Sequence, residues 1–208
     1  MKRVCQLKVK FPIKSKGIEL LLEVDSDEKF KNGIKIRNRY SIDLQKDYTQ
    51  TASITCLNPS KATKTKSDYT INKIVNFFYE NNKYEIGRLD IYNLYPFYLT
   101  DSTDLVYMFA SLESDYYNEF IDDNYEEMKK HISCKTKNIV AWGGYPNGFN
   151  QLTYEEDVKR MLKFLRKFGK VYSFETNRGC CTQKGKHPYH PSSRFNNLVD
   201  IIEYNHKE

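Results

Sequence analysis

The stretch "TASITCLNPSKAT", residues 51–63, decides how the rest of the chain is interpreted. Its apolar run is typical of a buried strand, and Asn58, Pro59 and Ser60 follow that run directly. A turn accounts for this tripeptide, because a residue before proline is pushed into an extended conformation and serine caps a following helix. A loop that presents an amide and a hydroxyl to a small ligand is the second interpretation. Both remain open at the level of sequence.

Helix-like and strand-like segments alternate after this stretch. Apolar residues recur at the spacing of an amphipathic helix within residues 67–82, namely Ile71, Ile74, Val75 and Phe78. The remaining expected elements are strands within 88–97, 138–144 and 170–176 and helices within 124–132 and 153–169, the last one starting with a capping-box-like Thr153 and Glu156. Such alternation is typical of βαβ units, so residues 51–176 should form a mainly parallel central sheet flanked by helices.

The first 50 residues alternate like strands in three runs, residues 5–11, 17–25 and 38–45. The predicted fold class is therefore α/β, with an antiparallel N-terminal extension over residues 1–50 and a core over residues 51–208. At 208 residues the chain is expected to form a single domain. Its tail, from residue 195 to residue 205, is expected to form a closing helix.

Charge and cysteine content restrict the partner and the compartment only loosely. The 33 Lys and Arg against 27 Asp and Glu give a net charge of +6, which favours a polyanionic partner, although solvated helix faces explain the same excess. The five cysteines have no regular spacing, and no segment resembles a signal peptide or a membrane span. We therefore expect a cytoplasmic protein with reduced thiols and no membrane partner. Abundant Lys, Asn, Ile and Tyr suggest an A/T-rich genome, such as that of a low-GC bacterium or a phage.

Several common site motifs are absent from the sequence. It contains none of the glycine-rich or catalytic signatures of dinucleotide oxidoreductases, P-loop NTPases, serine hydrolases or zinc deaminases. Cys180 and Cys181 precede His187 and His190, but adjacent cysteines cannot form the usual Cys-x-x-Cys knuckle. We therefore expect neither a metal nor a cofactor.

The carboxyl ends of parallel strands meet at one edge of a sheet, where ligands bind. At the expected strand ends lie Asn58, Asn93, the run Trp142, Gly143 and Gly144, and a late loop with His187, His190 and Arg194. Amides, an indole and imidazoles suit a planar heterocycle, because an amide offers a donor and an acceptor and an aromatic ring offers stacking. The sequence therefore predicts a site for a nucleobase, nucleoside or nucleotide, or for nucleic acid.

Other interpretations of these residues stay open. Asp68 and Thr70 are explained as helix N-terminal residues, or Asp68 is a general base over the crevice. Trp142 is explained as core, or as a ligand platform beside two glycines that permit close approach. One of the two histidines, His187 or His190, would stabilise an anionic leaving base.

The motifs "RYSID", "LNPSKAT", "SDYTI", "IYNLYPF", "IVAWGG" and "GKHPYHPS" resemble, in this order, those of a bacterial and phage family of unknown function, domain of unknown function 1643 (DUF1643). The resemblance spans residues 38–193. It identifies the motifs of the family in this sequence but implies no activity. This chain departs from the pattern in the insertion "RGCC" and in a longer N-terminal segment.

The same order of motifs is more distantly similar to the uracil-DNA glycosylase superfamily. This likeness implies a three-layer architecture and a metal-independent cleavage of an N-glycosidic bond. The likeness places Asn58, Pro59, Asn93, His187 and His190 at its motifs. Together with the strand-end residues above, the hypothesis makes Asn58, Asp68 and His187 catalytic, and the ligand-binding residues would be Pro59, Ser60, Thr70, Asn93, Trp142, Gly143, Gly144, His190 and Arg194. The alternative is a non-catalytic protein that sequesters a nucleotide-derived signal or recognises modified nucleic acid.

Overall fold

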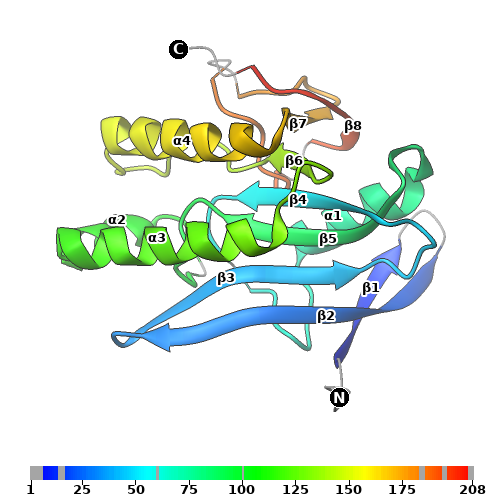
Figure 1. The fold of residues 1–208 in the computed structure, drawn as a ribbon, viewed down its shortest axis with the longest axis horizontal. Helices are drawn as coiled ribbons and strands as arrows, with labels where there is room; N and C mark the ends of the chain where they lie inside the picture. The colour runs from blue at the N-terminus through cyan, green and yellow to red at the C-terminus, as the bar shows by residue number, and fades with distance from the viewer. Residues whose placement is uncertain are drawn as a thin grey trace.

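The computed structural model describes residues 7–13, 17–59, 61–99, 101–182, 186–193 and 196–205. Within them, eight strands form one sheet in the order β1-β2-β3-β5-β4-β6-β7-β8 (Figure 1). The strands are β1 (Leu7–Ile13), β2 (Ile18–Lys31), β3 (Ile34–Asp43), β4 (Gln50–Cys56), β5 (Ile86–Asn93), β6 (Lys137–Val140), β7 (Val171–Thr176) and β8 (Leu198–Glu203).

The middle of the sheet is parallel and its two sides are antiparallel. Strands β5, β4, β6 and β7 pair in parallel, as predicted for residues 51–176. The antiparallel N-terminal strands are also confirmed, and they join the same sheet because β3 pairs with β5. With β8 antiparallel to β7, antiparallel pairs outnumber parallel ones. The prediction of a mainly parallel sheet therefore holds only for the centre, and the sheet as a whole is mixed.

Helices cover both faces of the sheet (Figure 1). They are α1 (Tyr69–Glu80), α2 (Asp104–Ser111), α3 (Ser114–His131) and α4 (Gln151–Leu165), with short 3₁₀ turns η1 (Asn82–Tyr84) and η2 (Arg166–Phe168). The apolar face of α1 packs in one core with Ile54 and Ile91. Buried residues of α2, α3 and α4 form the core of the other face, together with Val140 and Trp142. Side chains alternate along each strand, so one strand supplies both cores.

One predicted element is wrong, and one predicted helix start is misplaced. The C-terminal tail forms strand β8 instead of a closing helix, because its backbone pairs with the edge of β7, where Phe174 lies opposite Ile201. Helix α4 begins at Gln151 with Asn150 as its N-cap, since the side chain of Asn150 accepts a hydrogen bond from the backbone N–H of Thr153.

Two other features were not predicted. Helix α2 has no counterpart in the sequence pattern, and α3 extends ten residues before the predicted start at Asn124. No helix in the described part of the chain combines the length and the apolar character that a membrane span requires.

A β-bulge in β3 affects the site. Arg39 lies opposite Asp27 and Arg37 lies opposite Glu28, so Asn38 is the extra residue on β3. An extra residue reverses the alternation of side chains along the strand. As a result Arg37 and Arg39 face opposite sides of the sheet.

Candidate ligand-binding site

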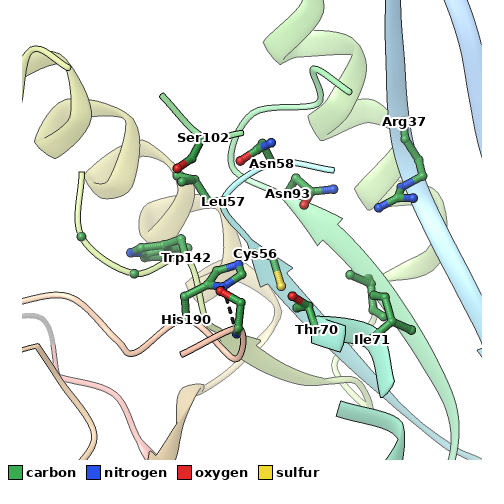
Figure 2. Close-up of a pocket in the computed structure, with 14 residues that line it drawn as sticks. Arg37, Cys56, Leu57, Asn58, Thr70, Ile71, Asn93, Ser102, Trp142 and His190 are labelled. Carbon is green, nitrogen blue, oxygen red and sulfur yellow. Dashed lines mark hydrogen bonds between the residues drawn. The ribbon is translucent and has the colours of Figure 1, made fainter. Parts of the chain in front are cut away.

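A cavity of about 350 Å³ lies at the carboxyl ends of β4 and β5 (Figure 2). This volume is near the lower end of the range for small-molecule sites. Its wall comes from β3, β4, β5, the segment after β6, the first turn of α1 and two loops. The residues that line it are Arg37, Cys56, Leu57, Asn58, Thr70, Ile71, Ile91, Asn93, Ser102, Trp142, Gly143, Gly144, His190 and Ser192. The structure thus gathers seven of the predicted site residues around one hollow.

Asn58 is held by its own loop. Its Nδ2 donates to the carbonyl oxygens of Pro59 at 3.0 Å and Leu99 at 3.1 Å. Its Oδ1 accepts no hydrogen bond within the described part of the chain. Because the donors of the amide are used, the oxygen is the group that Asn58 offers to a ligand or a water. Pro59 itself is buried and does not line the cavity.

Asn93 is held from two sides and is only 1% exposed. With its amide oriented by the surrounding hydrogen-bonding groups, its Nδ2 donates to the carbonyl oxygens of Asn58 at 3.2 Å and Tyr92 at 3.3 Å. The backbone carbonyl of Asn93 accepts from Nδ2 of Asn124 in α3 at 2.8 Å. These bonds join the ends of β4 and β5 and orient the amide oxygen of Asn93 for another donor.

Trp142 belongs both to the core and to the cavity wall. The side chain is fully buried, and its Nε1 has no hydrogen-bond partner among the described residues. The core interpretation of Trp142 is therefore correct, and the residue also lies in the wall of the cavity.

The backbone after Trp142 requires glycine. Gly143 has φ of +79°, and a Cβ there would lie 3.2 Å from Cβ of His190. Its carbonyl accepts a hydrogen bond from the buried hydroxyl of Tyr154 at 2.8 Å. Gly144 has open space around it and also lines the cavity. The close approach at Gly143 allows His190 to pack directly beside the strand end.

His190 is held as a neutral imidazole. Its Nδ1 accepts from the backbone N–H of Ser192 at 3.1 Å and lies 2.7 Å from the hydroxyl of the same residue. An accepting Nδ1 places the ring proton on Nε2. Burial lowers the pKa of His190 to about 4, against a smaller opposing effect of Asp68. At neutral pH the residue therefore offers an N–H donor without a positive charge.

Helix α1 contributes its first turn to the wall through Thr70 and Ile71. Asp68 is the N-cap of this helix: its carboxylate accepts from the backbone N–H of Ile71 at 2.9 Å and of Ala62 at 3.1 Å. These bonds agree with the capping interpretation, and Asp68 does not line the cavity. Its role as a general base stays a prediction. Lys73, also on α1, donates to the carbonyl oxygen of Ser193 at 2.9 Å and so anchors the loop of His190.

His187 lies in a neighbouring hollow of about 410 Å³, which shares Gly144 with the first cavity. Only 4% of the residue is exposed, and its Nε2 lies 3.3 Å from Oε1 of Glu155. Lys186 approaches the same carboxylate at 3.7 Å. The structure thus separates the two predicted histidines, and His190 is the one beside Asn58, Asn93 and Trp142.

The family model of DUF1643, proteins of unknown function, matches residues 39–192. The chain belongs to this family. The matched segment contains Asn58, Asn93, Trp142 and His190, so the DUF1643 region supplies most of the cavity. No curated protein and no solved structure matches the chain.

Arg37 lies two residues before the matched DUF1643 segment, and sequence reasoning missed it. Only 2% of this residue is exposed, although it lines the cavity. Alternation along a regular strand would have placed Arg37 on the same face as Arg39. The bulge at Asn38 overturns that expectation, and nothing in the local sequence marks it.

Cys56 was also not predicted as part of the wall. Burial raises the pKa of its thiol to about 12, so the thiol is protonated at neutral pH and a poor nucleophile. Ser60 and Arg194 were predicted to bind the ligand and lie outside the described residues. Within the described ranges, no group of three or more His, Cys, Asp or Glu side chains is placed to hold a metal ion.

Proposed function

We propose that this DUF1643 protein binds a nucleobase, nucleoside or nucleotide in the cavity at the carboxyl ends of β4 and β5. One observation carries the proposal: hydrogen-bonding groups from separate segments line one small hollow, and some of them have no partner among the described residues. Nε2–H of His190 is a donor, and Oδ1 of Asn58 is an acceptor. A heterocycle edge with alternating acceptors and donors satisfies such a set.

Cleavage of an N-glycosidic bond is the catalytic form of this proposal. Asn58 would orient a water through Oδ1, because its Nδ2 is already committed to the loop. His190 would donate from Nε2 to the departing base, since it lines the cavity and His187 does not. Both residues would act by positioning and hydrogen bonding, without a metal ion.

A second candidate function is binding without turnover, in which the ligand is sequestered or recognised unchanged. The specific observation that favours it is the composition of the wall: none of the described residues that line the cavity is a carboxylate. Asp68, the predicted base, caps α1 and accepts a second backbone hydrogen bond from Ala62. An amide oxygen is a weaker base than a carboxylate, so hydrolysis would have little acid–base assistance.

Native mass spectrometry of the purified chain tests binding, and chromatography of the recovered ligand tests turnover. We expect a nucleobase-containing ligand to bind the wild type, and Asn93→Ala and Asn58→Ala to weaken that binding at least about tenfold, the effect of about 1.4 kcal/mol. Asn118→Ala removes an exposed amide of α3 and serves as the matched control. Binding that is equal in all four proteins would contradict the proposed site.

The fate of the bound ligand distinguishes cleavage of an N-glycosidic bond from binding without turnover. Release of free base that stops in Asn58→Ala and His190→Asn, but continues in Asn118→Ala, supports cleavage. Tight binding with the ligand recovered intact supports sequestration. Failure of every nucleobase, nucleoside and nucleotide to bind would refute both forms.

A further inference from the structure

Arg37 is a buried cation that no carboxylate neutralises through an ion pair in the described structure. Its Nη1 donates to the carbonyl of Ala62, whereas its Nε is buried without a hydrogen-bond partner. The guanidinium packs against the rings of Tyr40 and Tyr98, 5.0 Å and 5.3 Å from their centroids. The protein therefore holds this charge in a fixed place and leaves most of its N–H donors unused.

The carboxylates of Asp68 and Glu28 raise the pKa of Arg37 without forming an ion pair with it, and both have other partners. Asp68 caps α1 with Oδ1 and accepts a hydrogen bond from the backbone N–H of Ala62 with Oδ2. Glu28 pairs with Lys35 at 3.2 Å and accepts a hydrogen bond from Ser26. Burial lowers the pKa of Arg37 because these distant charges do not compensate the loss of solvent. A buried charge without a partner is unfavourable, so its presence in a cavity wall indicates an anion that comes from outside the chain.

The first turn of α1 also lines the cavity, through Thr70 and Ile71. The N–H of Ile71 is already capped by the carboxylate of Asp68, so the hydroxyl of Thr70 is the polar side-chain group that this turn offers to a ligand. In Figure 2 the guanidinium of Arg37 points from β3 toward the space between Asn93 and Ile71. Arg37 is the one charged side chain among the described residues of the wall, since His190 is neutral.

We infer that the ligand carries an anionic oxygen group, a phosphate in the first place, which binds between Arg37 and the first turn of α1. This inference rests on the proposed function for the base half of the ligand and names its class: a nucleoside monophosphate in preference to the nucleoside. The base would contact Asn58 and His190, and the phosphate would contact Arg37 and the hydroxyl of Thr70. A cavity of about 350 Å³ suits a single nucleotide better than a dinucleotide.

Calorimetric titrations of the full chain test this inference with three probes: a nucleoside, its 5′-monophosphate, and inorganic phosphate. The monophosphate of the preferred base should bind wild type about 10- to 100-fold more tightly than the nucleoside, the range for hydrogen bonds to a charged group. Arg37→Gln, which keeps a donor for the carbonyl of Ala62, should remove that preference. Arg160→Gln removes one exposed positive charge of α4 and is the matched control.

The outcomes separate this inference from the proposed function. A nucleoside that binds wild type as tightly as its monophosphate would overturn the phosphate site and leave the base site standing. Inorganic phosphate that binds wild type but not Arg37→Gln, with no nucleoside binding, would support the anion site and refute the nucleobase site. Equal loss of the preference in Arg160→Gln would also overturn the inference, because bulk charge would then explain it. Circular dichroism of each variant checks that it folds.

Discussion

Arg37 and Arg39 are two residues apart on β3 and lie in opposite electrostatic surroundings. Arg39 contacts three carboxylates on the side of α3: Asp25 at 2.7 Å, Asp90 at 3.5 Å and Glu127 at 3.7 Å. Arg37 faces the cavity on the side of α1 and forms no ion pair in the described structure. The positive charge of Arg39 is neutralised by carboxylates of the protein itself, as expected for a residue that stabilises the fold. The contrast therefore separates a structural arginine from one that is available to a ligand.

The largest expected effect on stability comes from replacing Arg39. Arg39→Met should lower the free energy of unfolding by about 3 kcal/mol, because three carboxylates lose the cation that they share and Asp90, whose side chain is 4% exposed, keeps only the half-exposed Arg88 as a partner. Urea denaturation monitored by circular dichroism measures this change. A loss below about 1 kcal/mol would show that the network around Arg39 is not what holds β3 to α3.

The next effect concerns the cavity wall beside His190. Gly143→Ala should cost about 1–2 kcal/mol, because alanine is strained at φ of +79° and its Cβ would meet that of His190 at 3.2 Å. Gly144→Ala is the matched control, since a Cβ there meets no atom within 4 Å. Thermal unfolding of both variants measures the difference. Equal stability would mean that the backbone at Gly143 relaxes and that the wall is not rigid.

A smaller effect is expected from pH. The pKa of His190 in the folded chain is about 4, below the ordinary value of 6.5 for the unfolded chain, so the unfolded chain binds more protons between these values. The contribution of His190 to stability is thus fully present above pH 6.5 and is lost as pH falls toward 4. Partial exposure of the ring reduces the effect to about 1 kcal/mol.

The measurement for this prediction is the difference in urea midpoint between pH 7 and pH 5. His190→Asn should show a smaller difference than wild type, and His131→Asn, which alters a half-buried histidine of α3, is the control. A wild-type difference that survives in His190→Asn would assign the pH dependence to another group.

The smallest effect on stability is expected from replacing Arg37. Arg37→Met should change the free energy of unfolding by less than about 1 kcal/mol without ligand, because the lost hydrogen bond to Ala62 is offset by removal of an unpaired buried charge. Chemical denaturation beside Arg39→Met tests this directly. A loss as large as that of Arg39→Met would make Arg37 a structural residue and remove the basis for an anion site.

Much of the architecture around the site was predictable from local pattern. The apolar spacing from Ile71 to Phe78 and the cap at Asp68 define α1, since both depend on residues within one or two turns. The strands before Asn58, Asn93 and Trp142 were also predictable from apolar runs and turn residues. Pattern failed for the tail, because β8 alternates too weakly to be told from a helix and depends on the edge of β7.

By itself the sequence determined the parallel centre, the antiparallel start, and the placement of Asn58, Asn93 and Trp142 at strand ends, because hydrophobic period and chain direction are local properties. Tertiary structure decided which histidine faces the cavity, since His187 and His190 are three residues apart on one loop and differ only in what packs against them. It also decided that Arg37 lines the cavity. That outcome depends on one extra residue opposite β2, and the register between two strands is a relation between distant segments that no single segment encodes.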